Sequence, residues 1–312
     1  MPTADLAIYP LRAPQIVNAD GLRIREDVLY TDAKGQDHER SKKSAQGLLA
    51  KLREILPALM EPNETILYIL RCQAPVGALE QLMLGWSVYQ VTATTLVLTN
   101  LRILHLAMDS GGKWKRTLRT VRWGNVAEAK VKGWIGKQFF LKYVDGKKEN
   151  YWRLRNKDAR KARDLIAAAI PASRSEQTPA RAMVALCPDC RTPLTARTYE
   201  CQSCGLTFKD EKTLLRRTIL VPGGGYWYTG IWILGFFSSF YEGIFTLGLA
   251  VELLVLAGLM APEVEPGSSV PTRGEMLEII VFLVVILALE KALQFIHSRR
   301  VVRTFLPLGR HR

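Results

Sequence analysis

The sequence has few histidines and none of the short motifs that commonly mark catalytic sites. Its four histidines are scattered over separate segments, and neither H-E-x-x-H nor G-x-S-x-G occurs. His105 falls in an alternating strand pattern and is expected to be structural. The run Gly223–Gly225 lacks the Lys-Ser/Thr pair with which a Walker A loop holds phosphate and magnesium, so we interpret it as a closely packed segment beside a membrane. We expect no enzymatic activity.

Acidic residues are also scarce, because 29 Asp and Glu stand against 43 Lys and Arg, a formal net charge of +14. Residues 101–165 contain 18 of these cations and 6 of the carboxylates, a local charge of +12. Hydrophobic residues nevertheless make up 48 % of the chain, which excludes a disordered or low-complexity protein. The basic region is expected to face a polyanion, either an anionic membrane surface or a nucleic acid.

Cysteine is sparse as well, but four of the five cysteines fall within 18 consecutive residues as two C-x2-C pairs. This spacing predicts one tetrahedral zinc site, with two disulfides or a redox pair as the alternative. The predicted ligands are Cys187, Cys190, Cys201 and Cys204. Residues 186–191 and 201–208 resemble the zinc ribbon family. A full set of four thiolates indicates a structural ion, since no position remains for water.

The first ten residues lack the basic and apolar regions of a secretory signal peptide. Two apolar stretches near the C-terminus predict transmembrane helices over 241–261 and 276–296. Residues 226–240 are expected to form an interfacial or re-entrant segment, because a single helix over 226–261 would be about 54 Å long. Cations flank both stretches, whereas the connection between them holds only Arg273. We therefore expect two membrane spans with both termini in the cytosol.

The juxtamembrane segment 211–225 leads into the first span, and a basic cytosolic tail, 297–312, follows the second. The stretch Val221-Pro-Gly-Gly-Gly-Tyr-Trp-Tyr-Thr-Gly230 resembles the start of the bacterial TM-two family of two-span membrane proteins. The resemblance implies a bacterial inner (cytoplasmic) membrane protein. Charged residues inside the spans need partners. From the helix rise, we predict an ion pair between Glu252 and Lys291. Alternatively, Glu290 and Lys291 extend to the cytosolic interface.

The N-terminal part of the chain predicts several elements. An N-terminal arm is expected over 1–43, with one short β-like run over 22–30 and a polar stretch over 31–43. An amphipathic helix, which Pro57 can kink, is expected over 44–61, where apolar residues recur every three or four positions. Short strands and a closing helix over 156–170 predict a small β-sandwich or barrel. The predicted strands are 64–72, 87–92, 95–107, 116–123, 126–132, 137–144 and 149–155.

The run Val97-Leu-Thr-Asn-Leu-Arg-Ile-Leu-His-Leu106 lies in the middle of these strands. The run and the closing helix resemble the bacterial pleckstrin-homology (PH) and GRAM domains, over residues 62–170. The resemblance implies an α+β PH-like sandwich or barrel with a C-terminal helix. A linker over 171–183 and the zinc ribbon, 184–210, would follow it. The expected chain is thus multidomain and ends in an α-helical transmembrane hairpin.

Three predicted turns of the PH-like domain concentrate lysine, and two of them also contain tryptophan. Lysine with tryptophan suits the headgroup region of an anionic membrane. The alternative is a solvated basic surface whose tryptophans belong to the core. The candidate contacts with lipid or another polyanion are Lys113, Trp114, Lys115, Arg116, Lys132, Trp134, Lys137, Lys147 and Lys148.

These features predict a non-enzymatic inner-membrane protein whose PH-like domain contacts anionic lipid headgroups or a protein partner, and which holds one structural zinc ion. A membrane-tethered nucleic-acid-binding protein is the alternative. It is disfavoured because only Arg191 and Arg197 are basic between the first and last zinc ligands. A transporter or channel subunit is disfavoured because two spans cannot enclose a pathway without oligomerisation.

Overall fold

The structure is a computed structural model that describes residues 15–309, except 20, 33–35, 37–38, 78–80, 82–87, 134–136, 173–181 and 262–270. The chain divides into two compact units. Met1–Thr207 with Gly309–Arg312 form the first, which we call the β unit. Phe208–Leu308 form the second, the helical unit.

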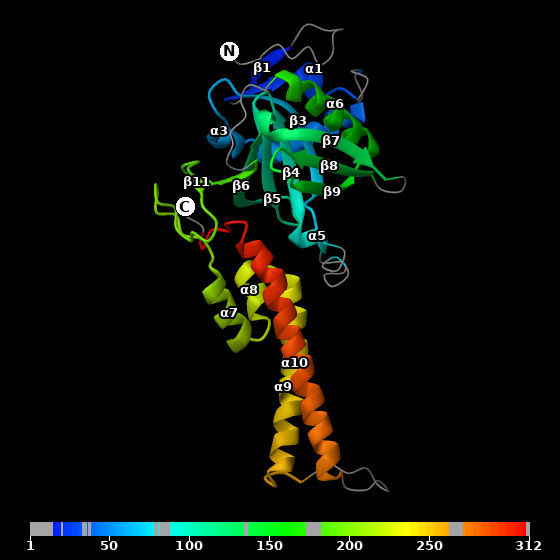
Figure 1. Cartoon of the computed structure of the whole chain (residues 1–312), viewed down its shortest axis with the longest axis vertical. Helices are drawn as coiled ribbons and strands as arrows, with labels where there is room; N and C mark the ends of the chain where they lie inside the picture. The colour runs from blue at the N-terminus through cyan, green and yellow to red at the C-terminus, as the bar shows by residue number, and fades with distance from the viewer. Residues whose placement is uncertain are drawn as a thin grey trace. The chain divides into compact units, whose positions relative to one another are not determined.

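A large, mainly antiparallel sheet forms the β unit (Figure 1). Its strands are β1 (Ile16–Ala19), β2 (Leu22–Arg25), β3 (Thr65–Gln73), β4 (Ala93–Thr99), β5 (Arg102–Met108), β6 (Trp114–Arg122), β7 (Val126–Lys132), β8 (Lys137–Tyr143), β9 (Lys148–Leu154), β10 (Val184–Leu186) and β11 (Pro193–Leu194). The main order is β11-β10-β6-β5-β4-β3-β9-β8-β7. Strands β3 to β6 thus make a four-stranded group that meets a three-stranded group, β7 to β9, where Gln73 pairs with Trp152.

Helices cover the sheet at several places (Figure 1). They are α1 (Glu26–Leu29), α2 (Glu39–Leu52), α3 (Leu56–Leu59), α5 (Val88–Val91) and α6 (Asn156–Ala172). The apolar face of α6 buries Ala162, Leu165 and Ile166, which recur at helical spacing, and α6 packs against β7 and β8. The helix expected over 156–170 is therefore present with nearly the expected bounds.

The segment expected as an N-terminal arm contributes to the fold instead. β2 pairs in parallel with β3, and α1 follows it directly. Leu22, Ile24 and Val28 are fully buried in the core. The ammonium of Lys161 on α6 donates to the carbonyl oxygens of Val28 and Thr31, and so connects this segment to the helix. The β-like run expected over 22–30 is therefore present as β2, which α1 follows, and it belongs to the core rather than to a mobile arm.

Other elements differ from their predicted bounds for local reasons. The helix expected over 44–61 is α2 followed by α3, because Pro57 suits only the first turn of a new helix. The strand expected over 87–92 is the short helix α5. The strand expected over 95–107 is the hairpin of β4 and β5, which turns at Asn100 and Leu101.

Hydrogen bonds inside the protein fix this hairpin turn. The hydroxyl of Thr99 donates to Glu64 Oε1 at 2.7 Å and accepts from the amide of Arg102 at 3.0 Å. The Arg102 guanidinium donates to both carboxylate oxygens of Glu64, each at 2.9 Å. Asn100 Oδ1 accepts from the backbone amide of Thr65 at 2.7 Å. The Thr-Asn-x-Arg sequence thus joins the hairpin to the start of β3.

The helical unit consists of α7 (Glu211–Leu220), α8 (Gly224–Thr229), α9 (Trp232–Leu256) and α10 (Arg273–Val302). α9 and α10 lie side by side, and each is long and apolar enough to cross a membrane (Figure 1). α10 begins with a capping box of Thr272 and Glu275.

The bounds of these two helices differ from the predicted spans. α9 begins at Trp232 rather than 241, because the chain breaks at Gly230, whose φ of 77° is favourable for glycine. α10 continues beyond 296 to Val302, so the first part of the expected basic tail is helical.

Candidate functional site

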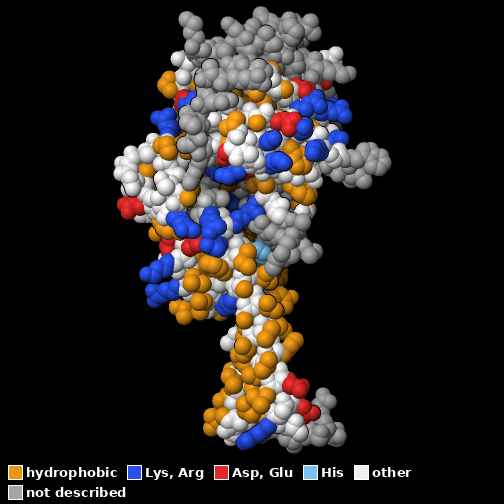
Figure 2. Space-filling view, viewed as in Figure 1, with side chains coloured by type: hydrophobic (Ala, Val, Ile, Leu, Met, Phe, Trp, Pro, Cys, Tyr) orange, Lys and Arg blue, Asp and Glu red, His pale blue; other side chains and the backbone are white. Residues whose placement is uncertain are grey.

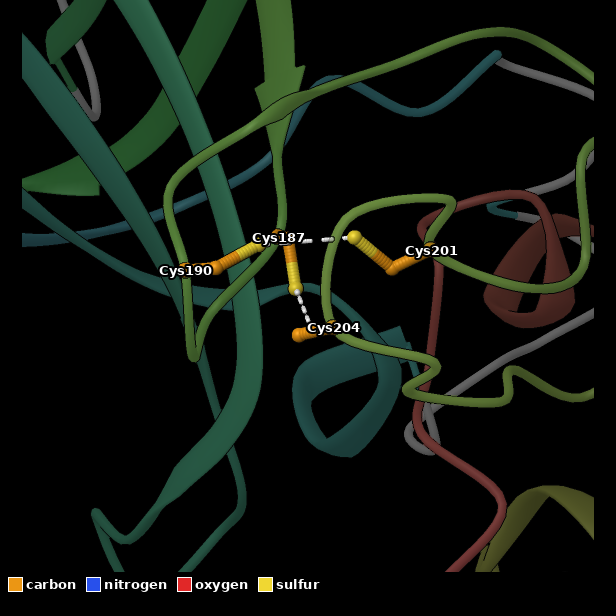
Figure 3. Close-up of side chains that lie close together, drawn as sticks. All are labelled: Cys187, Cys190, Cys201 and Cys204. Atoms are coloured by element: carbon orange, nitrogen blue, oxygen red, sulfur yellow. Dashed lines mark hydrogen bonds between the residues drawn. The ribbon is translucent and has the colours of Figure 1, made fainter.

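The four clustered cysteines bring their sulfur atoms together in the β unit (Figure 3). All four sulfurs lie within 4.8 Å of one another. Cys187 Sγ is 3.6 Å from Cys204 Sγ, and Cys190 Sγ is 3.4 Å from Cys201 Sγ. A tetrahedral ion with metal–sulfur bonds of about 2.3 Å needs sulfur separations of about 3.8 Å. The geometry therefore fits a metal ion such as zinc, and the described cysteines are free thiols, not disulfides.

Two similar turns position these ligands. In the first turn, the amide of Arg191 donates to the carbonyl oxygen of Cys187, and in the second, Gly205 donates to Cys201. Arg191 and Gly205 both have positive φ, 62° and 71°, which lets the chain reverse behind each pair of thiols. The Thr192 hydroxyl, 3.2 Å from Cys190 Sγ, lowers the pKa of that thiol and favours its ligating, deprotonated form.

The cysteine segment is part of the large sheet rather than a separate module. β10 pairs with β6 over Leu118–Thr120, immediately before the first ligand. Asp189, inside the first cysteine pair, accepts from the Arg116 guanidinium at 2.6 Å. Arg191 donates to the carbonyl oxygen of Met60 at 3.0 Å. Arg116, predicted to contact lipid, is therefore engaged in holding the cysteine turn against β6.

The remaining basic turns do not form one surface. Because β7, β8 and β9 are consecutive antiparallel strands, the β7–β8 turn lies at one end of β8 and the β8–β9 turn at the other. Lys132 and Lys137 thus lie at the opposite end from Lys147 and Lys148. Strands β6, β5, β4, β3 and β9 are antiparallel neighbours in this order. The β5–β6 turn, with Lys113, therefore lies at the same end of the sheet as Lys147.

The tryptophans expected at the lipid surface differ in environment. Trp114 is partly buried against the core, and its indole donates to the carbonyl oxygen of Thr117 at 3.0 Å. Lys115 beside it is also partly buried. Trp134 lies outside the described residues. Trp114 therefore fits the alternative that the tryptophans belong to the core better than it fits a lipid-facing position.

His105 is enclosed in the β unit. Its Nδ1 lies 2.8 Å from the hydroxyl of Tyr151, which also contacts the Glu149 carboxylate. Burial lowers the pKa of His105 to about 3, so the ring is neutral at physiological pH. This arrangement agrees with the structural role expected from the strand pattern.

The predicted ion pair between Glu252 and Lys291 is not the one in the structure. Lys291 Nζ lies 2.5 Å from Glu242 Oε2, and the Glu242 side chain is only 2 % exposed. Since α9 and α10 are antiparallel, residues equally far from the start of α9 and the end of α10 lie at the same level. Glu242 is ten residues after Trp232 and Lys291 eleven before Val302, whereas Glu252 lies about 15 Å further along α9. The prediction was wrong because it began the span at 241.

A buried polar cluster surrounds this pair. Gln294 donates to Ser238 at 2.8 Å and contacts both Glu242 and Glu290. The backbone amides of Gly223 and Gly225 donate to Glu242 and Gln294 respectively. We call Ser238, Glu242, Glu290, Lys291 and Gln294 the polar cluster. It connects the glycine turn before α8 to both long helices.

We predict that Lys291→Met destabilises the helical unit by about 1–3 kcal/mol, because it leaves the buried Glu242 carboxylate without its cation. The double variant Lys291→Met/Glu242→Gln should recover most of this loss. Thermal unfolding of the full chain in detergent measures both. Glu252→Gln is the control, and a loss as large as that of Lys291→Met would contradict the observed pairing.

Two glycines at the start of α8 and one in α9 pack too closely to accept a side chain. A Cβ on Gly224 would lie 2.0 Å from the carbonyl oxygen of Arg217, and one on Gly225 would lie 2.7 Å from Thr218 Oγ1. A Cβ on Gly235 would lie 2.8 Å from the Trp227 ring. The glycine run therefore serves close packing in this structure, as its interpretation from sequence expected.

Gly224→Ala should destabilise the helical unit by about 3 kcal/mol, because the obstructing atom is backbone and cannot rotate away. Gly243→Ala is a matched control, since nothing lies within 4 Å of its Cβ position in α9. Tryptophan fluorescence during heating in detergent compares the two. Equal melting temperatures for both variants would mean that α8 is not packed as described.

No known protein family matches the chain, and no characterised protein or solved structure is detectably similar to it. Ser238, Glu242 and Gln294 were not among the predicted site residues. Ser238 and Glu242, four positions apart on α9, and the polar Gln294 on the otherwise apolar α10 were the signals in the sequence.

Proposed function

We propose that this chain is a non-enzymatic integral membrane protein whose helical unit anchors the β unit at the cytosolic face of a bacterial inner membrane. The observation that carries the proposal is the exposed apolar surface of α9 and α10, which Figure 2 shows in orange. Trp232, Leu247 and Phe282 are all more than 60 % exposed. Soluble proteins rarely expose so large an apolar surface, whereas lipid would cover it.

The lengths and flanking charges of the helices support a two-span hairpin. Helices of 25 and 30 residues are about 37 and 45 Å long, enough to cross a ~30 Å hydrocarbon core. Cations lie in α7 and at the end of α10, while residues 257–272, between α9 and α10, contain no Lys or Arg, and Arg273 is the first residue of α10. This asymmetry favours both ends of the hairpin on the cytosolic side.

We further propose that the β unit binds anionic lipid headgroups or a protein partner, and that its cysteine centre holds one structural zinc ion. A four-stranded group, a three-stranded group and a following helix support the resemblance to PH-like domains. A patch on a membrane-anchored domain needs little affinity, because anchoring keeps its effective concentration in the ~mM range. Lys113, Lys147 and Lys148, at one end of the sheet, are the candidate contacts.

Topology provides the first test. A reporter that is active only in the periplasm should be silent when fused after Arg312, and the chain should resist extraction from membranes by alkaline carbonate. An active reporter or a fully extracted chain would contradict the proposed hairpin.

Binding provides the second test. The full chain, reconstituted in neutral nanodiscs, is mixed with phosphatidylglycerol vesicles, phosphatidylcholine vesicles or DNA over a salt series. We expect binding to the anionic vesicles that weakens with salt. Tighter binding to DNA would favour the nucleic-acid alternative, and no binding to any of the three would favour a protein partner.

A further inference from the structure

A cavity of about 670 Å³ opens in the β unit between α2, the end of β3, the end of β9 and the start of α6. Its volume suits a small molecule. Among the described residues, five cations and one carboxylate, Asp158, line it. The cations are Lys43, Lys51, Arg71, Arg153 and Arg155. We propose that this cavity binds a phosphate monoester, supplied either by a lipid headgroup or by a free metabolite.

The Asp158 carboxylate neutralises only one of these five cations, because it is paired with Arg155. Asp158 accepts from Arg155 Nε at 2.7 Å and from the Tyr68 hydroxyl at 2.9 Å. In the part of the chain that the structure describes, neither Arg71 nor Arg153 forms an ion pair. Two guanidinium groups thus line the hollow without an ion-pair partner among the described residues, and a bound anion would stabilise them.

Two of the arginines are held in place before any ligand binds. The Arg153 guanidinium stacks over the Tyr89 ring, 4.1 Å from its centre, and Arg153 has a φ of 55°, uncommon for a bulky residue. Arg155 donates to Ser44 Oγ at 2.9 Å as well as to Asp158. Such preorganisation reduces the entropy lost on binding.

The chemistry of the lining favours phosphate over other anions. Planar guanidinium groups bind phosphate through paired hydrogen bonds, and lysines add point charges. Lys43 has only an exposed pair with Glu39, at 2.9 Å, which costs little to exchange for a ligand. Ser44, Gln73 and Ser110 also line the cavity and can bind ester or hydroxyl oxygens.

The inference deepens the proposed function and rests on it for access to a lipid headgroup. The β5–β6 turn borders the cavity through Ser110, but Lys113, Lys147 and Lys148 are not among the residues that line it. Lys43 and Lys51 come from α2, outside the segment that resembles PH-like domains, so the site depends on how α2 packs on β3.

The experiment uses the full chain in a neutral detergent and two soluble probes with the same phosphate chemistry. Glycerol 3-phosphate represents a free ester, and dihexanoyl phosphatidic acid represents a lipid headgroup. Calorimetric titration should show binding of at least one probe, weakened about tenfold or more in Arg71→Gln/Arg153→Gln, because each cation removes a charge-assisted hydrogen bond. Arg160→Gln/Arg163→Gln removes the same charge from two exposed residues of α6 that do not line the cavity, and it should change affinity less than about twofold.

If both probes bind, a free phosphate ester is sufficient for binding. If only phosphatidic acid binds, the ligand is a lipid headgroup. Either result supports the inference. No binding of either probe, or equal loss in both double variants, overturns it. Arg71→Lys keeps the charge and should retain intermediate affinity, so a folding defect is distinguished from a lost contact. If the probes fail while the reporter after Arg312 stays silent and vesicle binding persists, the cavity inference fails and the proposed function stands.

Discussion

Cys190→Ser is expected to lower metal affinity by more than about a hundredfold, because it removes one of four thiolate ligands and a hydroxyl is a poor substitute. The wild-type chain should contain about one equivalent of zinc after purification, and the variant little. Elemental analysis measures the content. Metal binding to four-thiolate sites supplies about 10 kcal/mol or more to folding, so the cysteine segment should also unfold locally.

Cys72→Ala is the matched control for this prediction. Cys72 is a free, buried cysteine in β3, away from the four clustered thiols. This variant should keep its full zinc content even if its stability falls slightly. Hydrogen exchange should show lost protection at β10 and the facing residues of β6 in Cys190→Ser alone. Unchanged zinc in Cys190→Ser would contradict the assignment of the centre.

Arg102→Met should destabilise the β unit by about 3–5 kcal/mol, because it leaves the Glu64 carboxylate buried without a cation. The Arg102 side chain is 4 % exposed and that of Glu64 is fully buried. The loss reaches beyond the pair, since Glu64 also accepts from Thr99 in the hairpin turn. Thermal unfolding of the full chain, followed by circular dichroism, measures the change.

Arg163→Met provides the comparison on α6, where the arginine pairs only with its exposed neighbour Asp164. It should change stability by less than about 0.5 kcal/mol. Arg102→Lys should fall between the two, because a lysine retains the charge but cannot donate to both carboxylate oxygens. Equal effects of Arg102→Met and Arg163→Met would mean that the hairpin turn does not depend on its buried ion pair.

The metal centre could be predicted from sequence because its ligands are local. Two residues separate the cysteines of each pair, and this spacing alone brings both thiols to one side of a turn. α6 and the apolar helices were also predictable, because a period of three to four or a long apolar run indicates helix directly. The spacing of the cysteines does not reveal that β10 pairs with β6, because that contact joins residues more than sixty positions apart in the sequence.

The ion pair of the helical unit shows why other details could not be predicted. The partner of Lys291 depends on the residue at which α9 begins, and that residue depends on the packing of Gly223–Gly230 against both long helices. An error of nine residues in the start of the helix moved the expected partner from Glu242 to Glu252. The basic cavity was missed for a similar reason, because its cations lie in three segments far apart in sequence.

The pairing of β10 with β6 gives the metal centre a consequence for solubility. With β10 and the two-residue β11 in place, the long strand β6 is covered along Leu118–Thr120. If the thiols were oxidised or deprived of metal, β10 would detach and β6 would become an open sheet edge. Exposed edges pair readily with strands of other chains. Zinc-starved or oxidised cells should therefore accumulate aggregates of this protein that begin at β6.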